Sequence, residues 1–153
     1  MRLSSLGVLG CGFMQIPKFF DIVHALSTSG KGFTFSGHTA GYFHGLCDGD
    51  VTVAEIMNPV GVFPYISKVS PLLWTEVLYD DIENRIPLGN TGNFYTGLHQ
   101  TVLDMINSER SIDRTDDALK ELRRRGLLEE IVGYCRQHGL CEDKLQYALE
   151  GLE

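Results

Sequence analysis

The chain has 153 residues, of which 43% are apolar and 22% are charged, and its formal net charge is −7. This length suits one domain, or a small domain with an appendage, and the composition is that of a soluble globular protein. An acidic balance argues against a nucleic-acid-binding protein, which usually carries a basic face. No segment contains the roughly 18 consecutive apolar residues that a membrane-spanning helix needs, and we expect a cytoplasmic protein.

The prolines and the charged residues divide the chain into two parts. All five prolines lie at or before Pro87, whereas charged residues become dense after residue 108. This distribution predicts a turn-rich body followed by solvated helices. The four cysteines contain no C-x-x-C pair and have the spacing of neither a zinc ribbon nor a disulfide framework, so we expect buried thiols.

The first elements are predicted to be strands. Residues 18–27 are rich in Phe, Ile and Val and could form a strand or a short helix. The glycines of residues 28–32 are typical of a hairpin turn, because glycine adopts positive φ without steric strain. A strand is then expected at Phe33–Phe35, with alternate side chains on opposite faces.

Helix signals follow this strand. Residues 38–47 have an apolar face with helical spacing, and Gly49 can end the helix in the left-handed conformation. Thr52–Glu55 has the pattern of a capping box, which predicts a second helix ending near Asn58. A third helix is predicted over Ser70–Asn84, with Ser70 as its N-cap and proline at the first helical position.

The remainder of the chain is predicted to be mostly helical. Residues 86–93 are a loop, and residues 94–107 repeat the apolar spacing of a helix. Glycines separate three further short helices, expected at residues 115–125, 127–138 and 141–152.

The stretch from Lys31 to Asp50 contains most of the residues that could carry chemistry. Catalysis by Ser36 with His38 lacks the G-x-S-x-G context, and no acid is placed by spacing to orient the imidazole. A metal site has the right atoms but no recognised spacing. Its candidate ligands are His38, His44, Cys47, Asp48 and Asp50.

The tail has the pattern of a helix-turn-helix, with Gly139 as the turn residue. The second helix of that pair begins with Glu142 and Asp143, which a phosphate backbone would repel. A structural three-helix element is therefore the preferred interpretation of the tail.

Three short motifs resemble those of a known family. They are His38-Thr39-Ala40, Leu46–Gly49 and Thr52–Ile56, and Leu119–Glu130 is similar to the helix that ends many members. Together they resemble the PqqD-like family, the winged-helix domains called RiPP recognition elements. One departure is the long separation between Ile56 and Ala118. The third winged-helix helix is therefore either Ser70–Asn84 or Thr115–Arg125.

The resemblance implies an α+β fold with a small N-terminal β-sheet and winged-helix-like helices over residues 1–87, and a helical extension over residues 88–153. It also implies peptide recognition in ribosomal natural-product (RiPP) biosynthesis, without catalytic residues, metal or cofactor. A precursor (leader) peptide would add as a strand to the sheet edge formed by Gly32–Ser36, and a separate modifying enzyme would receive it. The expected peptide-binding residues are Gly32, Phe33, Thr34, Phe35, Ser36, Leu73, Val77, Leu119 and Leu122.

Three alternatives remain open at this point. A winged-helix DNA-binding regulator would use Arg123–Arg125 to contact phosphates. A small metal-dependent enzyme would use the histidines and Cys47. An acidic inhibitor protein of a mobile element is neither supported nor excluded by the sequence.

Overall fold

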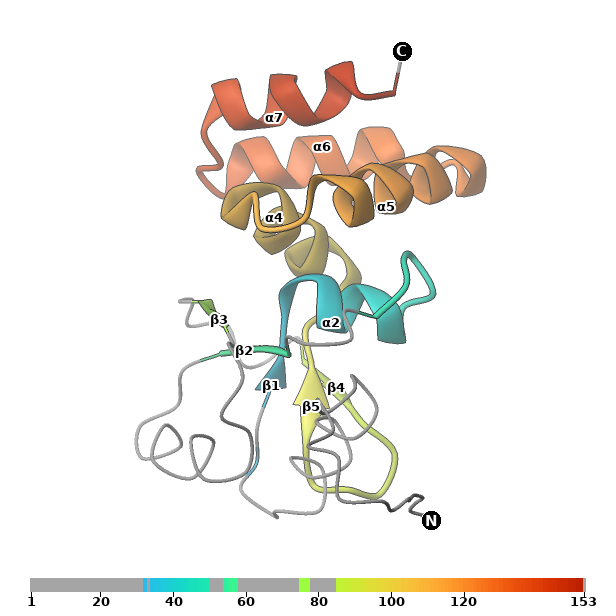
Figure 1. Ribbon diagram of the computed structural model, residues 1–153, viewed down its shortest axis with the longest axis vertical. Coiled ribbons are helices and arrows are strands. Elements are labelled where there is room, and N and C mark those ends of the chain that lie inside the picture. The colour runs from blue at the N-terminus through green and yellow to red at the C-terminus, as the bar shows by residue number, and fades with distance from the viewer. Residues whose placement is uncertain (1–31, 33, 50–53, 58–74, 78–84, 153) are drawn as a thin grey trace, which may run out of the picture.

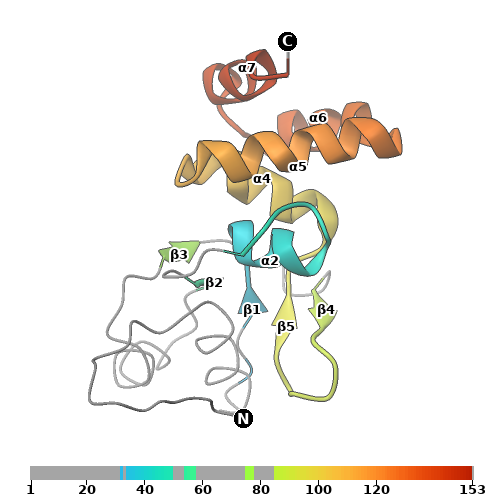
Figure 2. The same ribbon diagram turned by 45° about the vertical axis from the view of Figure 1, so that its right-hand side comes forward.

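The computed structural model describes residues 32, 34–49, 54–57, 75–77 and 85–152. Short strands gather at one end of the molecule and four helices at the other, and helix α2 (Gly37–Phe43) lies between them (Figures 1 and 2). The predicted α+β class, with a small sheet followed by a helical C-terminal part, is confirmed.

The sheet is mixed and has five strands in the order β3-β2-β1-β5-β4. Strand β1 pairs antiparallel with β2, where Phe35 lies opposite Ile56, and parallel with β5. The outer pairs are β2 with β3, parallel, and β5 with β4, antiparallel. The strands are β1 (Thr34–Phe35), β2 (Glu55–Met57), β3 (Thr75–Val77), β4 (Ile86–Pro87) and β5 (Phe94–Tyr95).

This order corrects the predicted position of the sheet edge. The strand at Phe33–Phe35 is confirmed at Thr34–Phe35, but it lies in the middle of the sheet. Hydrogen bonds from Ser36 N to Glu55 O (3.0 Å) and from Thr96 N to Phe35 O (3.0 Å) occupy it on both sides. An incoming peptide therefore finds no open backbone edge on β1.

Two predicted helices are strands where the structure describes them. Glu55–Met57 is β2, although Thr52–Glu55 has the pattern of a capping box. Thr75–Val77 is β3, in the middle of the predicted helix Ser70–Asn84. In a capping box the glutamate would bond the backbone at Thr52, but the Glu55 carboxylate bonds the start of α2 instead. The winged-helix arrangement implied by the resemblance is therefore wrong at its second helix.

The C-terminal helices agree closely with their predicted ranges. The longest, α5, has an acidic residue in its first turn and three arginines in its last, which complement the helix dipole. Gly126, at φ 76°, ends it in the left-handed conformation. Helix α4 begins at Leu98, later than predicted, because Phe94–Tyr95 belongs to β5. The four helices are α4 (Leu98–Ser108), α5 (Ile112–Arg125), α6 (Leu128–Gln137) and α7 (Glu142–Glu150).

An apolar core lies between these helices. Leu119 and Leu122 of α5, both expected to contact a peptide, are fully buried in it. Helix α2 packs against α4 and joins the helical part to the sheet. The core comprises Leu46, Val102, Leu103, Met105, Ile106, Ala118, Leu119, Leu122, Ile131, Cys135, Leu140 and Leu145.

The predicted domain boundary falls inside a hairpin. Pro87, the last residue of the expected first domain, pairs with Phe94 of the second. Strand β5 then pairs with β1, so residues after 87 complete the sheet before the helices begin at Leu98.

Candidate functional site

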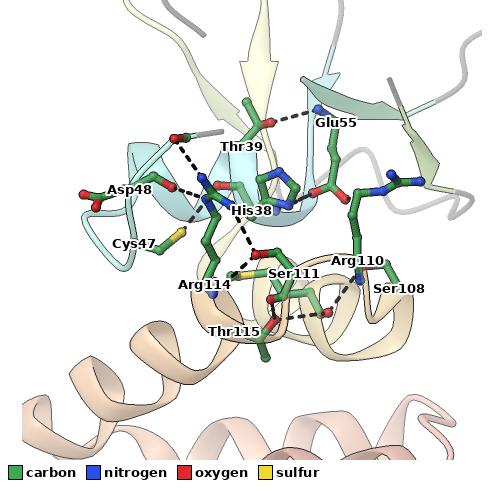
Figure 3. A network of polar contacts seen from close by, with 12 residues as sticks. His38, Thr39, Cys47, Asp48, Glu55, Ser108, Arg110, Ser111, Arg114 and Thr115 are labelled. Atoms are coloured by element: carbon green, nitrogen blue, oxygen red, sulfur yellow. Dashed lines mark hydrogen bonds and ion pairs between the residues drawn. The ribbon is translucent and has the colours of Figure 1, made fainter. Parts of the chain in front are cut away.

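A cluster of buried polar residues lies where α2 begins (Figure 3). Glu55 of β2 is fully buried, and one of its carboxylate oxygens, Oε2, accepts hydrogen bonds from two nitrogens of His38. These are the backbone nitrogen at 2.5 Å and the ring Nδ1 at 2.9 Å. The other oxygen, Oε1, lies 3.7 Å from Nε of Arg110. A carboxylate at the amino end of a helix interacts favourably with the unpaired N–H groups and the dipole.

The sequence around His38 is shaped by this carboxylate. Gly37 has φ 55°, and a β-carbon there would lie 1.9 Å from Oε2 of Glu55. Only glycine suits this backbone conformation and this close approach together. Thr39 completes the connection, because its hydroxyl accepts a hydrogen bond of 2.8 Å from the Glu55 backbone nitrogen. The residues around His38 therefore fasten helix α2 to strand β2.

A second contact joins the end of the α2 segment to α5. Arg114 donates a hydrogen bond to the carbonyl oxygen of Asp48 (3.0 Å), as Figure 3 shows. It donates another to the carbonyl oxygen of Gly49 (3.2 Å). The N-cap side chain of α5, Ser111, accepts bonds from both the backbone and the side chain of Arg114. The polar residues of this region thus connect three elements of the fold.

The geometry does not assemble a serine nucleophile. Glu55 supplies the acid that sequence spacing did not reveal, and it holds Nδ1 of His38. Ser36 is fully buried, however, and its hydroxyl has no hydrogen-bond partner among the described residues. A catalytic serine needs a hydrogen bond to its base and access for substrate. Neither requirement is met by Ser36.

The candidate metal ligands are engaged elsewhere. Nε2 of His44 donates to the carbonyl oxygen of Thr96 at 2.8 Å, and burial lowers the pKa of His44. The thiol of Cys47 donates to the His38 carbonyl oxygen, and burial raises its pKa to about 12, so it stays protonated. Asp50 lies outside the described residues. Within the described ranges, no three His, Cys, Asp or Glu side chains are grouped so that they could hold a metal ion.

The arginines expected to contact DNA are held by internal partners. Arg124 and Arg125 both pair with Glu121, the latter at 2.7 Å. Arg123 donates to the Leu152 carbonyl oxygen at 3.2 Å. Phosphate binding would have to compete with these contacts, which weakens the DNA-binding alternative.

Most of the described residues that were predicted to bind a peptide are buried. Thr34, Phe35, Ser36, Leu119 and Leu122 are buried, and the last two belong to the helical core. Gly32 is half-buried before β1, and Val77 ends β3. Phe33 and Leu73 lie outside the described residues.

A groove that the sequence reasoning missed lies among the ends of three helices. The end of α4, the start of α5 and α7 from Lys144 onward line a cavity of about 360 Å³. Ile112 and Tyr147, which are 57% and 60% exposed, line it. Among the described residues these are the two exposed large apolar side chains. Met105, Ile106 and Ala148 also contribute apolar surface.

Four carboxylates also line this groove. Glu109 and Asp116 each have a lysine partner, at 3.7 Å from Lys144 and 2.9 Å from Lys120, respectively. Asp113 and Glu150 also line the groove. Ile112 could have been identified from the sequence, because it extends the apolar face of α5 by one turn beyond the residues buried in the core. Tyr147 lies off the buried stripe of α7, and its role depends on tertiary packing.

Comparison with protein-family models, curated proteins and solved structures finds no significant match for this chain. In the part of the chain that the structure describes, no helix combines the length and apolarity required to cross a membrane.

Proposed function

We propose that this chain is a non-catalytic peptide-recognition subunit of the cytoplasm, which binds a precursor peptide and delivers it to a separate modifying enzyme. The observation that carries the proposal is the groove at the ends of α4, α5 and α7, which we call the helix-end groove. It combines about 360 Å³ of space with two exposed apolar side chains, Ile112 and Tyr147. Contiguous exposed apolar surface on a globular protein commonly marks an interaction site.

The motifs around His38 favour the same class of function. They resemble those of peptide-recognition domains, and their polar side chains fasten α2 to β2. The proposal relocates binding from β1, which is paired on both sides, to the helix-end groove. Cys47, Cys135 and Cys141 are free thiols, which suits a reducing compartment such as the cytoplasm.

A displayed library of random 12-residue peptides tests the proposal. Selection on the purified chain should yield peptides that bind with micromolar dissociation constants. The variant I112A/Y147A removes the exposed apolar contacts and should weaken this binding at least tenfold, a loss of about 1.4 kcal/mol. Because both side chains are largely exposed, the variant should fold normally.

Gln137→Ala is the matched control, since this side chain is exposed on α6 and makes no contact with the helix-end groove. It should leave the dissociation constants unchanged. Failure to select any peptide would refute the proposed function. Binding that is equal in wild type and I112A/Y147A would also refute it.

A further inference from the structure

We infer that the helix-end groove takes a basic amphipathic helix, whose apolar face contacts Ile112 and Tyr147 and whose lysine or arginine side chains pair with Asp113 and Glu150. This inference rests on the proposed function and specifies the chemistry of the partner.

The position of the groove favours a helical partner over an extended one. All five described strands lie toward the other end of the molecule (Figures 1 and 2). Among the described strands, an extended peptide in the groove would find no edge with which to pair its backbone N–H and C=O groups. A helix satisfies these groups internally and presents side chains only, at i, i+3, i+4 and i+7.

The apolar surface of the groove would bind the apolar face of the partner helix. Ile112 stands at the first position of α5 and Tyr147 on α7, and both line the same cavity. A volume of about 360 Å³ is at the lower end of the range for binding pockets, which suits one or two large side chains.

The charged side chains of the groove favour a partner with basic residues. Four carboxylates and the ammonium group of Lys144 line the groove. Lys144 donates to the Asn107 carbonyl oxygen at 2.7 Å and lies 3.7 Å from Glu109, and Asp116 pairs with Lys120. Asp113 and Glu150 have no ion-pair partner among the described residues. A cationic partner could therefore pair with Asp113 and Glu150 without displacing a lysine of the chain itself.

The helix termini add to this negative potential. Helices α4 and α7 both end beside the groove, and their last turns contain no basic residue. The carboxyl end of a helix carries partial negative charge and favours a cation. Lys144 and Arg123 each donate to one carbonyl oxygen at these ends, Asn107 and Leu152, which shows how cations are accommodated there.

A second copy of the chain is a poorer occupant than a basic helix. In a two-fold dimer the same surface patch meets itself, so the carboxylates of one groove would face those of the other. Like charges brought together across an interface are unfavourable. Charge complementarity therefore assigns the groove to a partner of opposite sign.

The test uses two fluorescein-labelled 14-residue peptides and the full chain. One peptide has leucine at i, i+3, i+4 and i+7 spacing with lysine at the remaining positions, and the other has glutamate in place of lysine. Fluorescence anisotropy at about 150 mM salt should show micromolar binding of the lysine peptide and at least tenfold weaker binding of the glutamate peptide. Proline in the middle of the lysine peptide should abolish binding, because it breaks the helix.

Two variants separate the groove from the overall charge of the chain. D113N/E150Q should weaken binding of the lysine peptide at least tenfold. D117N/E129Q removes the same number of charges from exposed positions outside the groove and should leave binding unchanged. Equal losses in both variants would overturn the inference, because the attraction would then be non-specific.

The remaining outcomes distinguish this inference from the proposed function. Library-selected peptides without basic residues that depend on Ile112 and Tyr147 would leave the proposed function standing and overturn the basic helix. Unweakened binding of the proline-containing peptide would overturn the helical partner. A concentration-dependent dimer that I112A/Y147A disrupts in sedimentation experiments would also overturn the inference, because the occupant would be a second copy.

Discussion

The buried carboxylate of Asp104 on α4, the helix that packs against α2, gives a direct test of the electrostatics inside the fold. Asp104 lies on α4 and is only 3% exposed. One of its carboxylate oxygens accepts a hydrogen bond of 2.9 Å from Gln100, and the other has no hydrogen-bond partner in the part of the chain that the structure describes. Burial, together with the neighbouring charge of Glu55, raises the pKa of Asp104 from 3.8 to about 7. The folded chain therefore holds this proton at pH values where the unfolded chain has released it.

The sign follows from proton linkage. Below about pH 4 both states hold the proton and Asp104 contributes no pH dependence. Between about pH 4 and pH 7 the native state binds more protons than the unfolded state, so stability falls as pH rises. Above about pH 7 the loss is complete. Raising the pKa of Asp104 from 3.8 to about 7 corresponds to a loss of about 4 kcal/mol at most in the free energy of unfolding.

Asp104→Asn removes this titration and keeps an oxygen for Gln100. Wild type should lose stability relative to D104N as the pH rises. The unfolding free energy of D104N minus that of wild type should therefore increase by roughly 1–4 kcal/mol from about pH 4 to about pH 8. Urea denaturation followed by far-ultraviolet circular dichroism at the two pH values measures it. The control D117N, at an exposed position of α5, measures the effect of removing one acidic charge without burial. A D104N difference that does not change with pH would refute the reasoning.

Two further predictions concern β1 and the start of α2, and a third compares the thiols of Cys47 and Cys141. Gly37→Ala should destabilise the fold by about 2 kcal/mol or more in thermal unfolding, because its β-carbon would overlap the Glu55 carboxylate at positive φ; an unchanged Tm would contradict the observed packing. Thr34→Pro should lower the Tm, because β1 is paired on both sides and proline removes a ladder donor; normal stability would show that the strand is free. Iodoacetamide should label exposed Cys141 well before Cys47, whose raised pKa keeps it protonated, as peptide mass spectrometry can measure; the reverse order would contradict this assignment.

The C-terminal helices could be predicted because their signals are local. Apolar residues recur with helical spacing along α5, and Gly126 and Gly139 mark the ends of successive helices at φ 76° and 80°. The starting residue of α4 could not be predicted. Phe94–Tyr95 joins β1 in the sheet, and that pairing involves residues far away in the sequence.

Strand β2 shows why the rest of the sheet was missed. Thr52–Glu55 satisfies the local pattern of a helix start, but Glu55 instead bonds His38, seventeen positions earlier. The motif His38-Thr39-Ala40 was recognised, but the need for glycine just before it was not, because the carboxylate that requires Gly37 comes from another element. The helix-end groove depends in the same way on the packing of α7 against the start of α5, which no single helix encodes.

The central place of β1 has a consequence for the order of folding. Helices α4–α7 follow one another along the chain and are joined by short turns, so their contacts form by closing short loops. Strand β1 gains one neighbour from β2 and the other from β5, beyond a long intervening segment. Closing long loops is slow, and local helical contacts form first. We therefore expect the helices to assemble early and β1, although it precedes them in the chain, to acquire its neighbours last.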